Sequence, residues 1–168
     1  MVTWTELRHE RPDIAEPGLL LLYPPHISVG LAYLATVRPD GGPRLHPMCP
    51  IVNDRGLFAL IVPGPKCNDL RRDGRYALHS FPTDDNEDAF YLTGRATAVT
   101  DHRVHEALVA QFLEERSAIG LSADDVAGQV PFSFDVSTAM LTATSGHGDP
   151  RPRHVIWHAP GGAAQVAT

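Results

Sequence analysis

The chain has 168 residues, a formal net charge of −6, and 43% hydrophobic and 20% charged residues. This length and this balance are typical of one folded domain, and we expect residues 1–168 to form it. An acidic chain lacks the basic surface of a general nucleic-acid binder, so we expect no nucleic-acid partner. Any anionic ligand must therefore be held by a local group of cations.

The N-terminal residues 1–18 are polar and show no secretory pattern. The longest apolar run, 27–37, is about half as long as a membrane-spanning helix. We therefore expect a cytoplasmic protein with no membrane partner. The two cysteines, Cys49 and Cys67, have no metal-type spacing, and we expect two reduced thiols, with a single disulfide as the alternative.

We expect residues 1–29 to form an N-terminal helix and a connector. Thr3 and Glu6 have the spacing of a capping box, which predicts a helix over 3–15 that Pro12 ends or kinks. The apolar segment 18–25 ends in two prolines and is interpreted as a connector that packs on the body of the protein.

From Gly30 onward the pattern favours strands. We expect a meander of strands at 30–38, 43–53 and 57–62, because a turn-forming sequence separates each from the next. Pro47 and Pro50 cannot donate ladder hydrogen bonds, so the second strand should be irregular or free on one side there. Residues two apart in a strand share a face, which places Arg44, His46 and Met48 on one side.

The remaining expected elements are a short helical turn at 63–75, strands at 76–81 and 89–99, a helix at 101–116, strands at 132–144 and 153–159, and a frayed tail at 161–168. The helix is the strongest of these. Asp101 can cap it, and Val104, Leu108 and Phe112 lie on one face. About seven short strands with tight connections and one long helix predict a mainly β fold, an antiparallel barrel with helices at its ends.

The segment 63–75 contains the most informative group of polar residues. Lys66 lies where a turn leads into a helix and backbone N–H groups are free, and Arg71 and Arg72 follow within two turns. This arrangement is typical of an anion site of the phosphate type. The alternative is a basic helix face that is only solvated.

Other candidate chemistry is weaker. His102 and His105 lie three apart on the expected helix, and His147, His154 and His158 cluster near the C-terminus, yet a set of surface polar residues explains both groups, and we expect no metal site. The chain has no Gly-rich nucleotide motif and no G-x-S-x-G elbow. Cys49 is interpreted as a small core residue rather than a nucleophile.

The meander, the turn "KCNDLRRDG" and the strand "LTGRA" together resemble the flavin-binding split-barrel family, the relatives of pyridoxamine 5′-phosphate oxidase. The resemblance is clearest over 30–99 and continues more loosely to "RHVIWH" at 153–158. It implies an antiparallel split β-barrel that binds flavin mononucleotide (FMN) in a cleft shared by two subunits of a homodimer. It also implies an oxidoreductase that moves a hydride or an electron pair to a small organic substrate.

Carried over by position, the resemblance assigns the phosphate to Lys66. The cofactor-binding residues that it implies are His46, Met48, Ile61, Val62, Lys66, Asn68, Arg71 and Trp157. Trp157 would act from the C-terminal strand on the partner subunit's cofactor, and a core tryptophan is the alternative. No catalytic residue is identified.

The sequence also departs from the oxidase. Pro65 stands where an arginine is common, "HPMCPI" replaces an arginine-led run, and Arg153 and His154 match the substrate-binding pair only loosely. Oxidation of pyridoxamine phosphate is therefore not the expected reaction. A deazaflavin-dependent reductase and a non-catalytic flavin- or haem-binding protein remain the alternatives.

Overall fold

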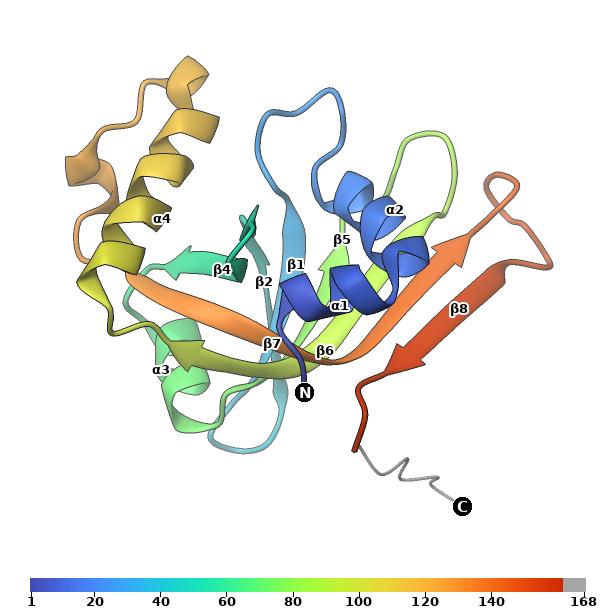
Figure 1. The fold of residues 1–168 in the computed structure, drawn as a ribbon, viewed down its shortest axis with the longest axis horizontal. Coiled ribbons are helices and arrows are strands. Elements are labelled where there is room, and N and C mark those ends of the chain that lie inside the picture. Colours follow the sequence, from blue (N-terminus) through green and yellow to red (C-terminus); the bar gives the residue numbers. More distant parts are fainter. Residues whose placement is uncertain (162–168) are drawn as a thin grey trace.

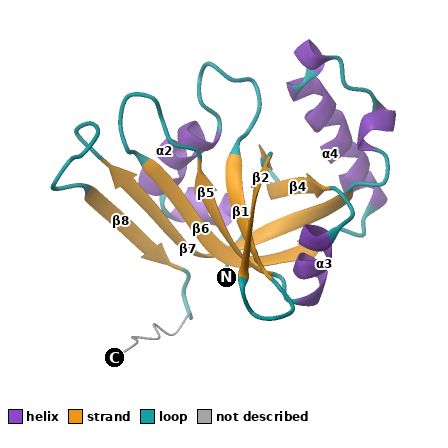
Figure 2. Cartoon of the chain, turned by 180° about the vertical axis from the view of Figure 1, so that it is seen from behind, coloured by secondary structure: helices purple, strands orange, loops and turns teal. Residues whose placement is uncertain are grey.

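A computed structural model describes residues 1–161 of the chain (Figures 1 and 2). Its elements are α1 (Trp4–Glu10), α2 (Pro12–Leu22), β1 (Ala32–Val37), β2 (Pro43–Met48), β3 (Ile51–Asn53), β4 (Gly56–Ile61), α3 (Pro65–Arg72), β5 (Arg75–Ser80), β6 (Ala89–Ala98), α4 (His102–Glu115), two 3-10 turns (Ser117–Ile119 and Ala123–Val126), β7 (Val130–Ala143) and β8 (Arg153–His158). Within these residues, eight strands form one antiparallel sheet, where we expected about seven strands. The mainly β, antiparallel fold expected from the sequence is confirmed.

The sheet has the strand order β2-β1-β5-β6-β7-β4-β3, with β8 added to β7. Only Cys49 and Pro50 separate β2 from β3 in the chain, although the two strands lie at opposite ends of this order. The sheet must therefore curl until its ends meet (Figure 2). Within the described residues no ladder joins those ends, and the barrel is split at this point.

The prediction of a single strand at 43–53 is wrong. The predicted meander of three strands is therefore wrong as well. Residues 43–48 pair with β1, whereas residues 51–53 pair with β4. Pro50 lies in the break and cannot donate a ladder hydrogen bond, and β2 pairs only with β1 among the described strands. The predicted irregularity at these prolines is thus confirmed, but it separates two hairpins.

The two longest strands, β6 and β7, form the middle of the sheet. Phe90, Leu92 and Ala96 of β6 are buried, and the register shifts between Thr93 and Gly94. A Cβ on Gly94 would lie 1.8 Å from the carbonyl oxygen of Asp135, so only glycine fits at this bulge.

Two helices cover the inner face of the sheet, where one helix and a connector were expected. The capping box at Thr3 and Glu6 is present, and α1 begins there. The connector over 18–25 is wrong, because α2 continues to Leu22 despite Pro17. Packing explains this result: a Cβ on Gly18 would lie 2.5 Å from the ring of Phe90, so the helix lies directly against the sheet.

The helix α4 covers a different part of the molecule. It spans His102–Glu115, close to the predicted 101–116, and the Asp101 side chain accepts hydrogen bonds from the N–H groups of Arg103 and Val104. Leu108 and Phe112 pack with residues of β3 and β4 in a second core that is separate from the main one. No helix among residues 1–161 is long and apolar enough to cross a membrane. The expected tail falls largely on 162–168, outside the described residues.

The outer face of β1, β2, β5, β6, β7 and β8 remains at least partly exposed. We call it the outer sheet face and define it by Tyr33, Leu45, Pro47, His79, Tyr91, Met140 and Ile156, which the strand registers place in neighbouring rows. Leu45 is 63% exposed and Ile156 is 53% exposed. The inner face of the same strands holds the main core.

Candidate functional site

Lys66 lies in the first turn of α3, directly after the buried strand β4. Gly64 has a φ of +154°, which allows the sharp turn from the strand into the helix. Lys66 is half-buried, and within residues 1–161 its ammonium group makes no hydrogen bond and no ion pair. Burial lowers the pKa of Lys66, and the nearby thiol of Cys49 opposes that shift. An anion at this position would therefore be favoured by Lys66.

The same short helix carries two further predicted site residues. Asn68 and Arg71 are both exposed, and within the described residues the guanidinium of Arg71 has no acidic partner. Free N–H groups at the helix N-terminus add to the positive potential there. Lys66 is also the only lysine in the chain. The structure thus places Lys66, Asn68 and Arg71 on the same short helix.

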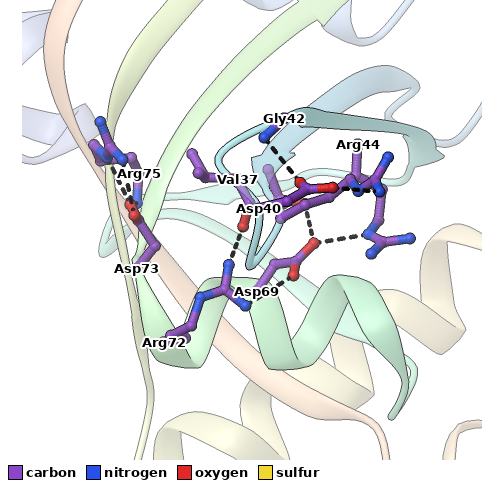
Figure 3. A network of polar contacts seen from close by, with 10 residues as sticks. Val37, Asp40, Gly42, Arg44, Asp69, Arg72, Asp73 and Arg75 are labelled. Carbon is purple, nitrogen blue, oxygen red and sulfur yellow. Dashed lines mark hydrogen bonds and ion pairs between the residues drawn. The ribbon is translucent and has the colours of Figure 1, made fainter.

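The Asp69 cluster consists of Thr36, Arg44, Asp69 and Arg72 (Figure 3). Asp69 is 2% exposed, and its carboxylate accepts hydrogen bonds from Arg44 Nε at 2.7 Å, Thr36 Oγ1 at 3.0 Å and Arg72 at 3.2 Å. Burial raises the pKa of Asp69, but these donors together outweigh it, and the net shift is downward.

Two of the arginines near the expected anion site, Arg44 and Arg72, pair with a carboxylate of the protein itself. Arg44 and Arg72 are bound to Asp69, and Arg72 also donates to the carbonyl of Val37. Part of the hydrogen-bonding capacity and positive charge of each guanidinium is therefore used by Asp69. Sequence reasoning missed Asp69, and the available signal was its position three residues before Arg72 on a helix.

His46 and Met48 share the face of β2 that carries Arg44, as predicted. Met48 is only 5% exposed and belongs to the main core. His46 is half-buried, and its Nε2 atom is shielded from solvent with no hydrogen-bond partner in the described residues. A shielded nitrogen of this kind has a hydrogen-bonding capacity that a ligand or a water molecule can satisfy.

The other predicted residues, Ile61, Val62 and Trp157, differ in exposure and in position. Ile61 is 1% exposed within the main core, whereas the adjacent Val62 is 61% exposed. Trp157 of β8 is half-buried against the main core and pairs with Ala139 of β7. Both ribbon views place β8, the strand of Trp157, on the opposite side of the molecule from α3, the helix of Lys66 (Figures 1 and 2).

Among the described residues, the histidines and cysteines form no metal site. The Nδ1 atoms of His154 and His158 lie 2.9 Å and 3.1 Å from the hydroxyl groups of Thr142 and Thr138. Within residues 1–161, no group of three or more His, Cys, Asp or Glu side chains is placed to hold a metal ion. Both cysteines are free thiols, as expected.

A second group of polar residues, also not predicted from the sequence, lies at the split of the barrel and forms hydrogen bonds with the backbone there. The Tyr23 hydroxyl donates to the carbonyl of Pro50 at 2.9 Å and accepts from the N–H of Val52 at 3.1 Å. The side chain of Gln111 donates to the carbonyl of Val52 at 3.1 Å and to Glu115 at 2.9 Å. We call Tyr23, Pro50, Val52, Gln111 and Glu115 the Tyr23 cluster.

The sequence matches no protein-family model and no curated protein. Solved structures do match the fold. HutZ, the haem storage protein from Vibrio cholerae, has a TM-score of 0.57 at 15% identity, over 88% of this chain and 92% of its own. A putative pyridoxamine 5′-phosphate oxidase from Listeria innocua has a TM-score of 0.58 at 16% identity, over 75% and 95%.

A third match is a NimC/NimA family protein from Clostridium acetobutylicum, with a TM-score of 0.58 at 16% identity, over 89% of this chain and 99% of its own. Likeness at this level of identity establishes the fold. The chain is a split barrel of the pyridoxamine 5′-phosphate oxidase type, which is the fold that the sequence resemblance implied.

Proposed function

We propose that two copies of the chain bind FMN between them and act as an oxidoreductase on a small organic substrate. The observation that carries this proposal is the unpaired, half-buried ammonium of Lys66 at the start of α3. Arg44 and Arg72 have a buried acidic partner, but Lys66 has none among the described residues. A phosphate group with nearly two negative charges is the ligand that such a site favours.

The residues present fit FMN in two respects. Lys66, Arg71 and the free N–H groups of α3 would hold the phosphate, and the shielded Nε2 atom of His46 would gain a hydrogen-bond partner. Bound FMN would supply the chemistry, because its ring accepts and releases a hydride or single electrons. The protein's own contribution would be to bind and orient the flavin.

The outer sheet face supports a homodimer. Its exposed apolar residues Leu45, Pro47 and Ile156 are covered by no part of the described chain. A second copy would bury this face, and Trp157 would then lie near the partner subunit's cofactor rather than its own. A stable dimer of this kind buries about 2,000 Å² or more.

Haem binding without catalysis is the second candidate. The likeness to HutZ, a haem storage protein, favours it, and the half-buried His46 offers a nitrogen that could serve as a ligand. An absorbance spectrum separates the candidates. Bands near about 370 and 450 nm indicate flavin, one near about 420 nm a deazaflavin coenzyme, and a sharp Soret band haem.

The phosphate assignment is tested by titrating FMN and riboflavin into the wild type and the Lys66→Ala variant. Loss of a charge-assisted contact should weaken FMN binding roughly ten- to a hundredfold, and riboflavin binding should barely change, because riboflavin has no phosphate. The control is Arg103→Ala, which removes an exposed cation on α4. Equal weakening of both ligands, or unchanged FMN binding, contradicts the assignment.

Catalysis is tested on the FMN-loaded protein. A nicotinamide reductant should bleach the flavin, and an added organic acceptor should reoxidise it over many turnovers. Bleaching and reoxidation with only one turnover would support a carrier instead.

A further inference from the structure

A separate hollow of about 340 Å³ lies at the opposite end of β4 from Lys66. It forms where two strands part: the ladder between β4 and β7 ends at Phe58 and Ser133, and β7 then meets Val2 at Val136. The volume is at the lower end of the range for small-molecule sites. Its walls are mainly apolar and include Leu57, Phe58, Val104 and Phe134.

One carboxylate lines this apolar hollow. Asp135 is half-buried, and within residues 1–161 its side chain makes no hydrogen bond and no ion pair. Arg95 is its neighbour in the β6–β7 register, but the Arg95 guanidinium donates to the carbonyl of Asp73 instead. Among the described residues, no side chain is therefore paired with this half-buried carboxylate.

The charges around Asp135 favour a cationic partner. Burial raises the pKa of the Asp135 carboxyl, the carboxylate of Glu6 on α1 raises it further, and the chain's N-terminal ammonium opposes both. Arg55 also lines the hollow, and its side chain is exposed. An added cation next to Asp135 would stabilise its charged form and would replace the missing partner.

We propose that this hollow binds a small organic cation, a protonated amine carried on a short apolar body. The ammonium group pairs with Asp135, and the apolar body lies against Leu57, Phe58 and Val104. Lys66 and the hollow lie at opposite ends of β4, so this site is independent of the flavin proposal. The same hollow discriminates against a carboxylic acid of similar shape, because Asp135 and Glu6 repel it.

The test is calorimetric titration of the full chain with phenethylammonium, and with 2-phenylethanol as a neutral molecule of the same shape. The wild type should bind the amine about ten times more tightly than the alcohol. Asp135→Asn should remove that preference and leave the affinity for the alcohol unchanged. Asp124→Asn, which neutralises an exposed carboxylate of a 3-10 turn, is the matched control and should behave like the wild type.

A second variant tests the location without altering charge. Val104→Phe adds volume to the wall of the hollow and should weaken both ligands at least tenfold, while the circular dichroism spectrum confirms the fold. The proposal is overturned if amine and alcohol bind the wild type equally, or if Asp135→Asn keeps the preference. Tighter binding of 3-phenylpropionate than of phenethylammonium would also overturn it, since that result assigns the site to Arg55.

Discussion

The Asp69 cluster and the Tyr23 cluster both hold one segment of the chain in place, the first through charged side chains and the second mainly through a neutral hydroxyl. Both hold the run from β2 to β3, where the sheet is split. The Asp69 cluster ties the start of this run to α3 through one buried carboxylate and two arginines. The Tyr23 cluster holds the end of this run through the neutral Tyr23 hydroxyl. This hydroxyl forms hydrogen bonds with the carbonyl of Pro50 and the N–H of Val52, as a neighbouring strand would do.

This difference shows how side chains can stand in for a β-ladder. A backbone carbonyl and an N–H that lose their ladder partners need only one hydroxyl, because a hydroxyl both donates and accepts. A helix that docks beside a strand needs a stronger anchor, and a buried carboxylate with several donors supplies it. The charged anchor also balances part of the charge of Arg44 and Arg72, whereas Lys66 and Arg71 have no acidic partner among the described residues.

The largest expected effect concerns the charged cluster. Asp69→Asn removes the negative charge that two arginines share and leaves part of their hydrogen bonding unsatisfied. We expect a loss of about 2–4 kcal/mol in the free energy of unfolding, measured in urea. Asp124→Asn serves as the exposed control. A loss under about 1 kcal/mol would contradict the larger contribution to stability that we assign to the Asp69 cluster.

The Tyr23 cluster should contribute less to the free energy of unfolding than the Asp69 cluster. Tyr23→Phe leaves the Pro50 carbonyl and the Val52 N–H without their bond, at a cost of about 1–3 kcal/mol. Tyr33→Phe is the matched control, since the Tyr33 ring stacks on Phe81 and its hydroxyl has no partner within the described residues. Hydrogen exchange should show faster exchange of the Val52 amide in Tyr23→Phe alone; unchanged exchange there would contradict the role given to Tyr23.

The two clusters should also differ in their response to pH. The pKa of Asp69 is below its usual 3.8, so its contribution is present above that pH and is lost as the pH falls through the lowered value. Burial and then Glu115 raise the pKa of Tyr23, so its contribution is complete below its usual 10 and is lost only in alkali. The difference in the free energy of unfolding between wild type and Asp69→Asn should therefore become smaller in acid. The corresponding difference for Tyr23→Phe should not change. Urea titrations from about pH 6 to pH 2 measure both differences, and parallel differences would contradict this distinction.

The smallest effect is expected at Arg75, one strand away from the Asp69 cluster. Arg75 pairs with Asp73 at 2.7 Å, but the Arg75 side chain is 65% exposed. Solvent screens such a pair, so Arg75→Ala should leave the urea midpoint unchanged within error. A clear shift would show that the network around α3 extends to the surface.

Parts of this structure could be predicted because short-range patterns decide them. The helix over 102–115 has its cap and its apolar face in the local sequence, and Lys66 is marked by the turn before it. The helical path of 18–22 was not predictable in this way. It depends on contact between Gly18 and Phe90, which are far apart in the sequence.

The candidate site was predicted only in part for the same reason. The spacing of Arg44, His46 and Met48 predicted one shared face, but not that this face turns inward to Asp69 and the main core. Whether Arg44 meets a ligand or a carboxylate depends on how α3 docks against β2. No pattern within either segment contains that information.

The split between β2 and β3 has a consequence for the order of folding. Two hairpins, β1–β2 and β3–β4, close early because their strands are neighbours in sequence. The ladder of β4 with β7 joins Phe58 to Ser133, which lies 75 positions later (133 − 58), so this closure is entropically costly and slow. Until it occurs, β4 and β7 expose unpaired edges, and a chain held at that stage is the species most prone to join with others.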